Sequence, residues 1–299
     1  ARLAALRAEL VARGLAGFVV PHADEFQNEY LPAHAERLAW LTGFDGSAGT
    51  AVVLAGRAAL FVDGRYTLQV REQADSGPWE FRHLIEEPAT AWLAETLGPE
   101  DRLGYDAWLH TPRQVEALRS ACEQAGAELV AVADNPLDAV WSDQPPPPAA
   151  PIVPHPERFA GRRAADKRAE IAAALKDGAD CVVLTAPDSI AWLLNLRGGD
   201  VAHTPLPLSL AILHSDATVD WCVDPAKPDE GLAAHLGNAV RQHDMTAFGG
   251  LLDGLGAAGK RVQVAADSAP AWVFDRLNSA GATLVRAPSC SRSSASSTV

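Results

Sequence analysis

The sequence predicts an α/β fold in two tandem copies, each a mixed β-sheet flanked by helices. Three observations lead to this prediction: the length of 299 residues, a proline-rich segment near the middle, and the same order of patterns on either side of it. A chain of this length accommodates two domains of about 150 residues each. Its 48% hydrophobic and 21% charged residues are typical of globular proteins.

The proline-rich segment marks the boundary between the two copies. Seven prolines lie among residues 144–156, four of them consecutive. Because proline fixes φ and lacks an N–H donor, this segment cannot join a helix or a central strand. We expect a stiff polyproline II connector. The predicted organisation is therefore a first domain over 1–144, a linker over 145–156, a second domain over 157–288 and a Ser-rich tail over 289–299.

The two sides of the linker repeat the same patterns in the same order. Each begins with a helical pattern ended by a glycine, then has a short apolar run, an Ala-Trp-Leu block and a strand-like run ending in Asp. Short apolar runs after helices suit strands buried on both faces. The predicted order is helix, strand, short helix or turn, hairpin, helix, strand, helix, strand, which implies a mixed sheet covered by helices. The matching segments are 3–14 and 167–178, 15–20 and 179–184, 39–41 and 191–193, 60–63 and 221–224, and 127–130 and 282–285.

Residues 43–50, Gly-Phe-Asp-Gly-Ser-Ala-Gly-Thr, allow three interpretations. A phosphate-binding loop requires a lysine and a following helix, and a serine nucleophile elbow requires G-x-S-x-G before a helix. Here Asp45 occupies the first elbow position and the strand-like run 50–54 follows. We favour the third interpretation, in which the glycines form a tight connection into a hairpin over 49–54 and 58–63.

Asp63-Gly64-Arg65-Tyr66 follows the second hairpin strand. Asp63 can cap the helical turn that begins there. Arg65 could bind a carboxylate through its guanidinium, or it could form a salt bridge with Asp24, Glu25 or another local acid. Both interpretations of Arg65 stay open, with the salt bridge slightly favoured.

Composition excludes several classes of function. The formal net charge of −13 disfavours nucleic-acid binding. The one basic run, Arg162-Arg163 with Lys167 and Arg168, is interpreted as a solvated helix start. No run of 18 apolar residues predicts a membrane span. The four cysteines are too dispersed for a zinc ribbon or a disulfide scaffold, which favours a reducing, cytoplasmic location.

Neither the histidines nor the glycine-rich segment 249–256 predicts a metal-binding or ligand-binding site. The nine histidines form no HExxH and no pair at i, i+4. His203 lies in the loop 200–205, where a hydrogen-bonded surface group is the favoured interpretation. The glycines of 249–256 follow no predicted strand and are interpreted as a helix or loop ending.

Several of these motifs, taken together, resemble a known family. Residues 43–49 and 62–66, followed by Gln69, resemble the first domain of the three-domain Xaa-Pro aminopeptidases, which are related to creatinase and prolidase. Residues 138–143, Asp-Ala-Val-Trp-Ser-Asp, resemble the family's exit from that domain. Residues 188–200, with His203 and Pro205, resemble its second domain. The resemblance covers residues 1–288 and implies two creatinase N-terminal-like domains.

The resemblance also implies a function. The family removes the N-terminal residue that precedes a proline, using two divalent ions, typically Mn²⁺, in a third, C-terminal "pita-bread" domain. We therefore expect the catalytic domain to be absent here, with no catalytic residue and no metal ligand in this chain. The expected role is a non-catalytic N-terminal portion that gates substrate access and supports assembly. The residues expected to face substrate are Arg65, Tyr66 and His203, and short Xaa-Pro peptides would bind only with the catalytic domain present.

Three further expectations follow. The tail 289–299 departs from the family pattern, and we interpret it as an out-of-frame or artificial ending. The surface that would meet the third domain could support a homodimer. The alternative function is a peptidase-like protein-binding module without catalysis, similar to family relatives that include a histone-chaperone subunit, and an acidic surface would suit basic partners.

Overall fold

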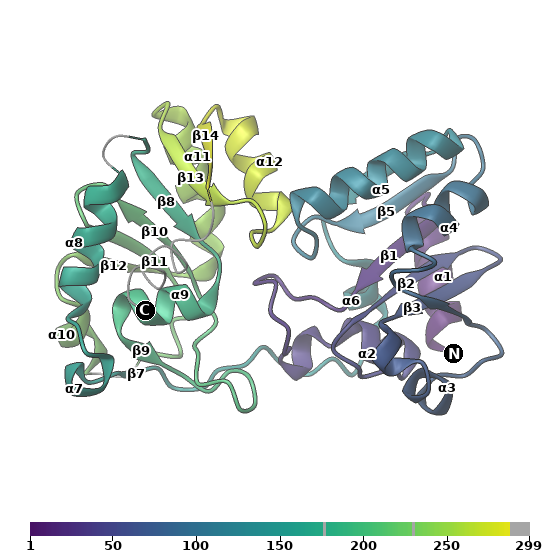
Figure 1. Ribbon diagram of the computed structural model, residues 1–299, viewed down its shortest axis with the longest axis horizontal. Coiled ribbons are helices and arrows are strands. Elements are labelled where there is room, and N and C mark those ends of the chain that lie inside the picture. Colours follow the sequence, from purple (N-terminus) through teal and green to yellow (C-terminus); the bar gives the residue numbers. More distant parts are fainter. Residues whose placement is uncertain (176–177, 229–230, 288–299) are drawn as a thin grey trace. The chain divides into compact units, whose positions relative to one another are not determined.

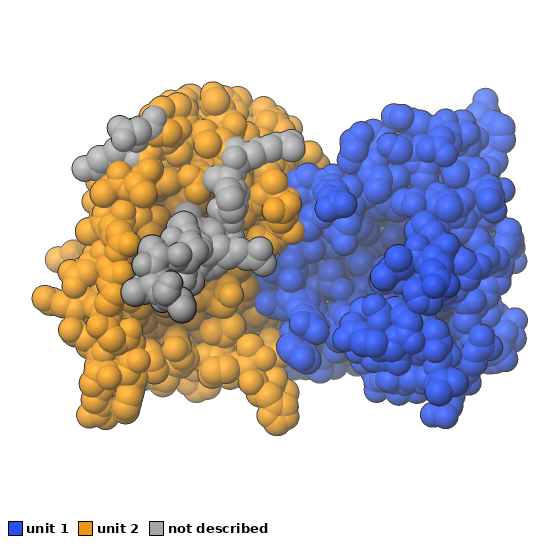
Figure 2. All heavy atoms as spheres, viewed as in Figure 1, with its two compact units in different colours: residues 1–147 blue, residues 148–299 orange. Residues whose placement is uncertain are grey.

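The computed structural model describes residues 1–175, 178–228 and 231–287 (Figure 1). The chain divides into two compact units, Ala1–Pro147 and Pro148–Val299, so the division falls within the proline run. Figure 2 colours the atoms of the two units separately. The predicted tail 289–299 lies outside the described residues. Among the residues that are described, none of the helices is long and apolar enough to cross a membrane.

Unit 1 holds a six-stranded sheet in the order β4-β3-β2-β1-β5-β6. β2 is antiparallel to β1 and β3, and the other neighbours are parallel. The strands are β1 (Gly17–Pro21), β2 (Gly49–Leu54), β3 (Ala58–Val62), β4 (Glu80–His83), β5 (Arg102–Asp106) and β6 (Glu128–Val132). The helices are α1 (Arg2–Ala12), α2 (Arg37–Thr42), α3 (Gln69–Gln73), α4 (Ala89–Thr96), α5 (Pro112–Ala125) and α6 (Pro136–Val140), with 3₁₀ turns at Ala33–Ala35 and Gly64–Tyr66.

Unit 2 holds a second six-stranded sheet in the order β12-β11-β10-β8-β13-β14. Its strands are β8 (Cys181–Leu184), β10 (Leu210–His214), β11 (Val219–Cys222), β12 (Val240–His243), β13 (Arg261–Ala265) and β14 (Thr283–Ala287). A separate two-stranded sheet pairs β7 (Val153–Pro154) with β9 (Leu196–Arg197). The helices are α7 (Glu157–Ala160), α8 (Ala164–Leu175), α9 (Pro187–Leu194), α10 (Leu232–Leu236), α11 (Phe248–Ala257) and α12 (Ala271–Ala280), with a 3₁₀ turn at Met245–Ala247.

The two sheets have the same topology, which confirms the predicted repeat and the mixed sheets. In each, the only antiparallel strand belongs to the hairpin, β2 in unit 1 and β10 in unit 2. The predicted order omits one strand of each six-stranded sheet, namely β4 and β12, and it also omits the separate pair β7 and β9, of which β7 lies within the predicted linker. Both β4 and β12 are edge strands whose residues are half-buried or exposed, so they lack the apolar run that reveals a central strand. The glycines of 249–256 lie within α11, and β12 does precede that helix.

Helices pack on both faces of the first sheet, which explains why its central strands are apolar throughout. Phe18 and Val20 of β1 belong to a cluster that includes Leu6 and Leu10 of α1. Side chains alternate along a strand, so Val19 faces the opposite side and is also buried. On this account, the continuous apolar run of β1 follows from burial on two faces.

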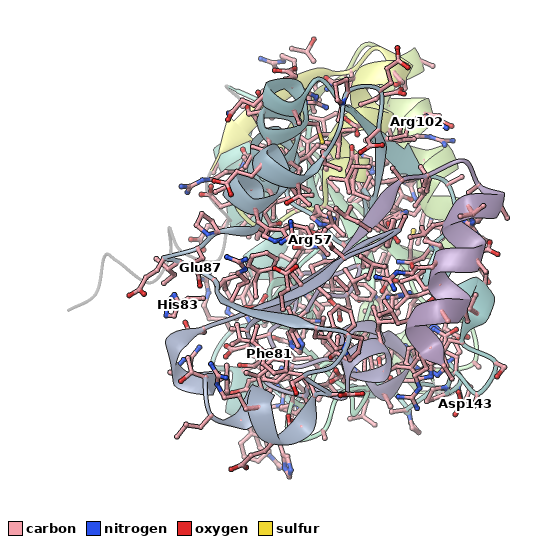
Figure 3. All side chains as sticks on the ribbon, turned by 90° about the vertical axis from the view of Figure 1, so that its right-hand side faces the viewer. Arg57, Phe81, His83, Glu87, Arg102 and Asp143 are labelled. Atoms are coloured by element: carbon pink, nitrogen blue, oxygen red, sulfur yellow. The ribbon has the colours of Figure 1, made fainter. Side chains whose placement is uncertain are left out.

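The outer edge of β4 carries a charged network (Figure 3). Glu80 accepts hydrogen bonds from Nε and Nη2 of Arg57 at 2.7 and 2.8 Å, and Arg82 pairs with both Glu80 and Glu87. The hydrogen bonds from Arg57 lower the pKa of Glu80 to about 2. Charged side chains on an edge strand oppose pairing with a strand of another chain. The network therefore protects the open edge of this sheet.

The interpretation of the basic run as a solvated helix start is wrong for two of its four members. Lys167 and Arg168 are only 2% and 7% exposed, whereas Arg162 and Arg163 are exposed. α8 packs against α9, and Nζ of Lys167 donates to the carbonyl oxygen of Trp192 at 2.9 Å. The end of a helix carries partial negative charge, so Lys167 is buried because it caps the C-terminus of α9.

Gly256→Ala is expected to destabilise unit 2, although alanine normally favours a helix over glycine by about 1 kcal/mol. A Cβ at Gly256 would lie 2.3 Å from Cβ and 2.5 Å from the carbonyl oxygen of Ala280, where α11 meets α12. Relieving this overlap should cost about 2 kcal/mol, measured by urea unfolding with hydrogen exchange to follow unit 2. Gly254→Ala in the same helix is the matched control, because nothing lies within 4 Å of its added Cβ. Equal effects of the two substitutions would contradict the prediction.

Candidate functional site

The parallel strands of unit 1 end at one edge of the sheet. β1, β3 and β5 run in the same direction, so the segments that follow them emerge together. These segments are 22–36, 63–66 and 106–111. Ligands of open α/β sheets bind outside the carboxyl ends of the strands, so this edge, called here the carboxyl edge, is the candidate functional site.

Asp63 organises the turn that follows β3. Its Oδ1 accepts hydrogen bonds from the backbone N–H of Arg65 at 3.0 Å and from Nε of Arg65 at 2.9 Å. The backbone hydrogen bond, followed by the side-chain one, holds the pKa of Asp63 below its usual value. The predicted cap is therefore present. It stabilises the 3₁₀ turn Gly64–Tyr66.

Arg65 forms a local ion pair and still has donors to offer. Its partner is Asp63, rather than Asp24 or Glu25, so the salt-bridge interpretation holds with a different acid. The side chain is 64% exposed. Within the described part of the chain, Nη1 and Nη2 have no hydrogen-bond partner, and these two groups form the fork that grips a carboxylate.

The guanidinium of Arg65 lies over the aromatic ring of Tyr66. The guanidinium carbon of Arg65 lies 5.2 Å from the centroid of the Tyr66 ring. The Tyr66 hydroxyl is 3.0 Å from Oγ of Ser47, and its ring contacts the edge of Phe44. Arg65 and Tyr66 are thus brought together as one exposed cation on an aromatic ring that is itself held in place.

The glycine segment 43–50 has the structural role that the sequence favoured. Gly43 adopts φ +85°, the left-handed region, at the C-terminal end of α2. A Cβ at Gly46 would lie 2.3 Å from the ring of Phe44. β2 begins at Gly49, so no helix follows to form a nucleophile elbow. The hydroxyl of Ser47 is hydrogen-bonded to that of Tyr66. The segment therefore leads into the hairpin and supports the turn that holds Arg65.

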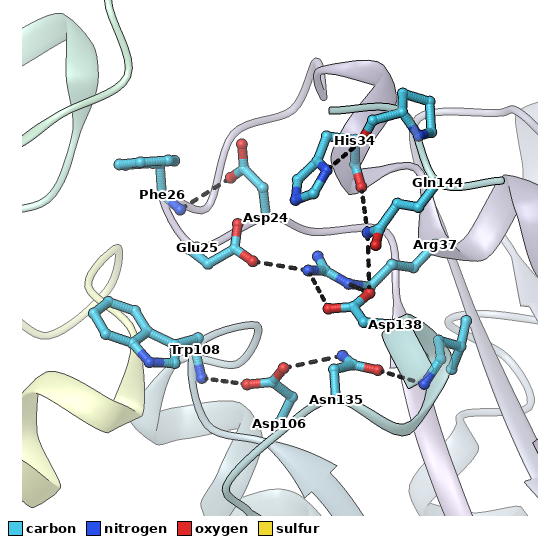
Figure 4. Close-up of polar contacts among 12 residues, drawn as sticks. Asp24, Glu25, Phe26, His34, Arg37, Asp106, Trp108, Asn135, Asp138 and Gln144 are labelled. Atoms are coloured by element: carbon cyan, nitrogen blue, oxygen red, sulfur yellow. Dashed lines mark hydrogen bonds and ion pairs between the residues drawn. The ribbon is translucent and has the colours of Figure 1, made fainter. Parts of the chain in front are cut away.

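A second polar network of unit 1 centres on the buried side chain of Arg37 (Figure 4). Arg37 is 4% exposed and donates to both carboxylate oxygens of Asp138, at 2.8 and 3.0 Å. It also donates to Glu25 at 3.0 Å. Gln144 donates to Asp138 and to the carbonyl oxygen of His34. This network ties the loop after β1 to the exit from unit 1.

The charge on Arg37 is set by two opposing effects. Burial works against the charged form, but the hydrogen bonds to Asp138 and the charge of Glu25 outweigh it and raise the pKa of the guanidinium. Nη1 of Arg37 is buried and has no partner among the described residues. The guanidinium of Arg37 therefore stays charged, and the ion pair persists wherever its partner carboxylates are ionised.

Two further carboxylates are buried at the carboxyl edge. Asp24 accepts hydrogen bonds from the backbone and side-chain N–H groups of Asn28, at 3.0 and 2.8 Å. Asp106 accepts from the backbone of Trp108 and from Asn135, both at 2.9 Å. Burial raises the pKa of both carboxyl groups, and these hydrogen bonds partly offset the effect. Both acids hold loop backbone in place.

His110 is a further buried titratable group at this edge, with 3% of its surface exposed. Its Nδ1 lies 2.8 Å from the carbonyl oxygen of Asp106, which makes Nδ1 the protonated nitrogen of the neutral ring. Nε2 has no partner among the described residues. Burial lowers the pKa of the imidazole to about 4, so the ring is neutral near pH 7.

His203, the third residue expected to face substrate, belongs to unit 2. It is exposed and adopts φ +60° at the tip of a short loop closed by a bridge between Val201 and Thr204. A non-glycine residue in this region is uncommon. The described residues contain no group of three or more His, Cys, Asp or Glu side chains that could hold a metal ion.

Sequence reasoning missed the residues that support the carboxyl edge from inside, Arg37, Asp106 and His110. One signal was available, because Asp138, the partner of Arg37, belongs to the exit motif 138–143. What the pattern does not show is that Arg37 and Asp138, 101 positions apart, are partners.

Comparisons with known proteins agree with the repeated fold. The creatinase/prolidase N-terminal domain family matches residues 2–139 and, in a second match of that description, residues 143–294. Aminopeptidase P1 of Lotus japonicus is 34% identical over 253 residues, which are 82% of this chain and 38% of that protein. A probable Xaa-Pro aminopeptidase P of Laccaria bicolor is 31% identical over 300 residues, 96% of this chain and 46% of that protein. The chain thus spans less than half the length of these relatives.

Among solved structures, an X-prolyl aminopeptidase from Caenorhabditis elegans, described as a cytosolic enzyme with a di-nuclear active site, superimposes with a TM-score of 0.88. It is 24% identical, and the match covers 96% of this chain and 49% of that one. At this identity the likeness shows the fold. Both units of this chain have counterparts within roughly half of that structure.

Proposed function

The chain belongs to the creatinase/prolidase N-terminal domain family, and from that premise we propose that it serves as the non-catalytic N-terminal portion of a Xaa-Pro aminopeptidase. In this proposal the two units limit access to a catalytic centre carried elsewhere and help to assemble it. The similarity to the N-terminal parts of aminopeptidases P supports the proposal. The cytosolic C. elegans relative supports a cytoplasmic location.

The single observation that carries the proposal is the Arg65 turn. An exposed guanidinium lies at the carboxyl edge, with Nη1 and Nη2 free of partners among the described residues, and it is held by Asp63 and by the ring of Tyr66. Such a group can bind a peptide carboxylate or carbonyl oxygen without further rearrangement. Arg65 and Tyr66 would position short Xaa-Pro peptides, and exposed His203 would do so from unit 2.

The described residues do not fit the di-nuclear centre of the C. elegans relative, because they contain no group that could hold a metal ion. We therefore assign no bond-breaking step to this chain. Its own contribution is to bind and orient the peptide and to restrict access by bulky substrates. Metal-dependent hydrolysis of the Xaa-Pro bond would belong to a separate domain.

Arg65→Ala should lower kcat/KM by about 10- to 100-fold in a polypeptide that joins these two units to an aminopeptidase P catalytic domain. This range corresponds to the loss of one hydrogen-bonded charge contact, about 1.5–3 kcal/mol. The measurement is release of the N-terminal residue from an Arg-Pro-Pro peptide. The kcat/KM of Arg65→Lys should lie between those of the unsubstituted polypeptide and Arg65→Ala, because lysine keeps the charge but lacks the planar fork.

The matched control is Arg113→Ala, at an exposed position on α5, which should leave kcat/KM unchanged. The 299-residue chain alone should release no product with or without Mn²⁺. Unchanged kcat/KM for Arg65→Ala would remove Arg65 from the proposal. Metal-dependent turnover by the pure chain would overturn the non-catalytic role itself.

A further inference from the structure

A group of cations gathers on unit 2 where β7, β9 and the start of α8 meet. His155 donates its backbone N–H to the carbonyl oxygen of Asn195 at 2.7 Å. Nδ2 of Asn195 donates to the carbonyl oxygen of Arg162 at 2.9 Å. β7 pairs with β9, so Val153 lies opposite Arg197. These contacts define the basic corner, whose members are His155, Arg158, Arg162, Arg163 and Arg197.

The charges of the basic corner are largely uncompensated. Arg162 pairs with Glu170. Among the described residues, Arg158, Arg163 and Arg197 form no ion pair. Residues 157–168 contain five basic and two acidic residues. Cations gathered in this way create a positive potential over the nearby surface.

Two buried cations add to that potential. Lys167 hydrogen-bonds to neutral oxygens of Trp192 and Asn195, and Arg168 has a buried Nε without a partner among the described residues. The nearby charges of Arg197 and Lys167 contribute, after burial, to lowering the pKa of His155. The corner is therefore cationic even where His155 is neutral.

An exposed aromatic side chain lies within the basic corner. Phe159 of α7 is 66% exposed. The guanidinium carbon of Arg158 lies 4.7 Å from its ring centroid, and the ring of His155 is 6.0 Å away. Aromatic and arginine side chains are the residues enriched in the energetically important centres of protein interfaces.

The corner contrasts with the rest of the chain. Unit 1 has 11 Arg or Lys against 22 Asp or Glu, a formal charge of −11, whereas unit 2 has 14 against 16, a formal charge of −2. Seven of the 14 basic residues of unit 2 lie in or beside the corner, at 158, 162, 163, 167, 168, 197 and 227. Lys227 is neutralised by Asp200, whereas Arg158, Arg163 and Arg197 of the corner form no ion pair among the described residues.

We propose that the basic corner of unit 2 is a docking surface for an acidic polypeptide segment. Carboxylates of the partner would pair with Arg158, Arg163 and Arg197, and an apolar side chain of the partner would cover Phe159. The acidic character of the partner is inferred from charge complementarity with these arginines of the corner. An acidic peptide is the chosen occupant because one chain segment can supply both dispersed carboxylates for the arginines and an apolar side chain for Phe159, and because unit 2, unlike unit 1, has a formal charge of only −2.

Fluorescence anisotropy of a labelled peptide with the repeat Asp-Glu-Leu tests the proposal. The 299-residue chain should bind it, and raising the salt concentration from about 50 to 200 mM should weaken binding several-fold, because exposed charges are screened. The double variant R158E/R163E should lose about 10-fold or more in affinity, and Phe159→Ala a comparable factor. These positions are exposed, so the substitutions should leave circular dichroism spectra unchanged.

The matched control is R113E/R119E, the same charge change at exposed positions of α5 in unit 1, which should leave affinity within about two-fold because neither residue belongs to the corner. Absent binding, or equal losses in the two double variants, would overturn the proposal. Stronger binding of a single-stranded oligonucleotide, lost in R158E/R163E, would reassign the surface to nucleic acid and also overturn it. So would self-association in sedimentation velocity that the same variant abolishes, since a second copy would then be the occupant.

Discussion

Arg37→Ala is expected to destabilise unit 1 by about 3 kcal/mol, the lower end of the cost of breaking a buried ion pair by removing one partner, because the carboxylates left behind are partly exposed. Arg37 is 4% exposed and holds Asp138 through two hydrogen bonds. Its removal leaves the half-buried carboxylates of Asp138 and Glu25 without their counter-charge. The measurement is the free energy of unfolding in urea, with hydrogen exchange by mass spectrometry assigning the loss to unit 1 and not unit 2.

Two comparisons make this prediction specific. Arg119→Ala removes an exposed arginine that pairs with Glu116 at i, i+3, and should cost less than about 1 kcal/mol. Adding Asp138→Asn to Arg37→Ala should recover part of the loss, because the double variant no longer carries that unpaired charge. A cost for Arg37→Ala as small as for Arg119→Ala would show that the buried network does not support the fold.

His110→Phe is expected to remove part of the acid sensitivity of unit 1. The pKa of His110 is about 4 in the folded chain, and about 6.5 when unfolded. As the pH falls below 6.5 the unfolded state takes up the proton first, so the stability of the folded state declines until the pH passes 4. The full difference corresponds to about 3 kcal/mol at 1.36 kcal/mol per pKa unit.

The measurement is the free energy of unfolding from pH 7 to pH 4. The difference between wild type and His110→Phe should shrink or reverse over this range, because the variant has no imidazole to titrate. Phenylalanine suits the position, since Nε2 of His110 is buried without a partner among the described residues. His203→Gln, at an exposed position, is the control and should keep the wild-type slope. Parallel curves for wild type and His110→Phe would contradict the prediction.

Elements with strong local signals could be predicted from the sequence. The hairpin of β2 and β3 has the predicted bounds within one residue, because apolar runs flank a turn at Gly56-Arg57. Asp63 caps its turn as expected, because capping involves neighbours in the sequence. The repeat could be predicted because both units bury equivalent strands between helices, which imposes the same apolar runs on each.

Elements without a local signal escaped prediction. β4 and β12 are polar edge strands, and nothing in their own residues distinguishes them from loops. Lys167 lies in a charged run that is typical of a solvated helix start. Its side chain is nevertheless buried, because it contacts the end of α9, 25 positions away. The pair of Arg37 with Asp138 depends likewise on two segments that only the folded sheet brings together.

The sequence by itself determined the two-unit α/β architecture, the family resemblance and the turn that presents Arg65, because each depends on apolar periodicity or on residues close in the chain. The tertiary structure alone decided which charges are buried and which remain free. It placed Arg37 within a carboxylate network, left Nη1 and Nη2 of Arg65 without a partner among the described residues, and gathered the cations of the basic corner around Phe159. The physical reason is that the energy of a charge depends on its solvation and its neighbours, and these are set by contacts between distant parts of the chain.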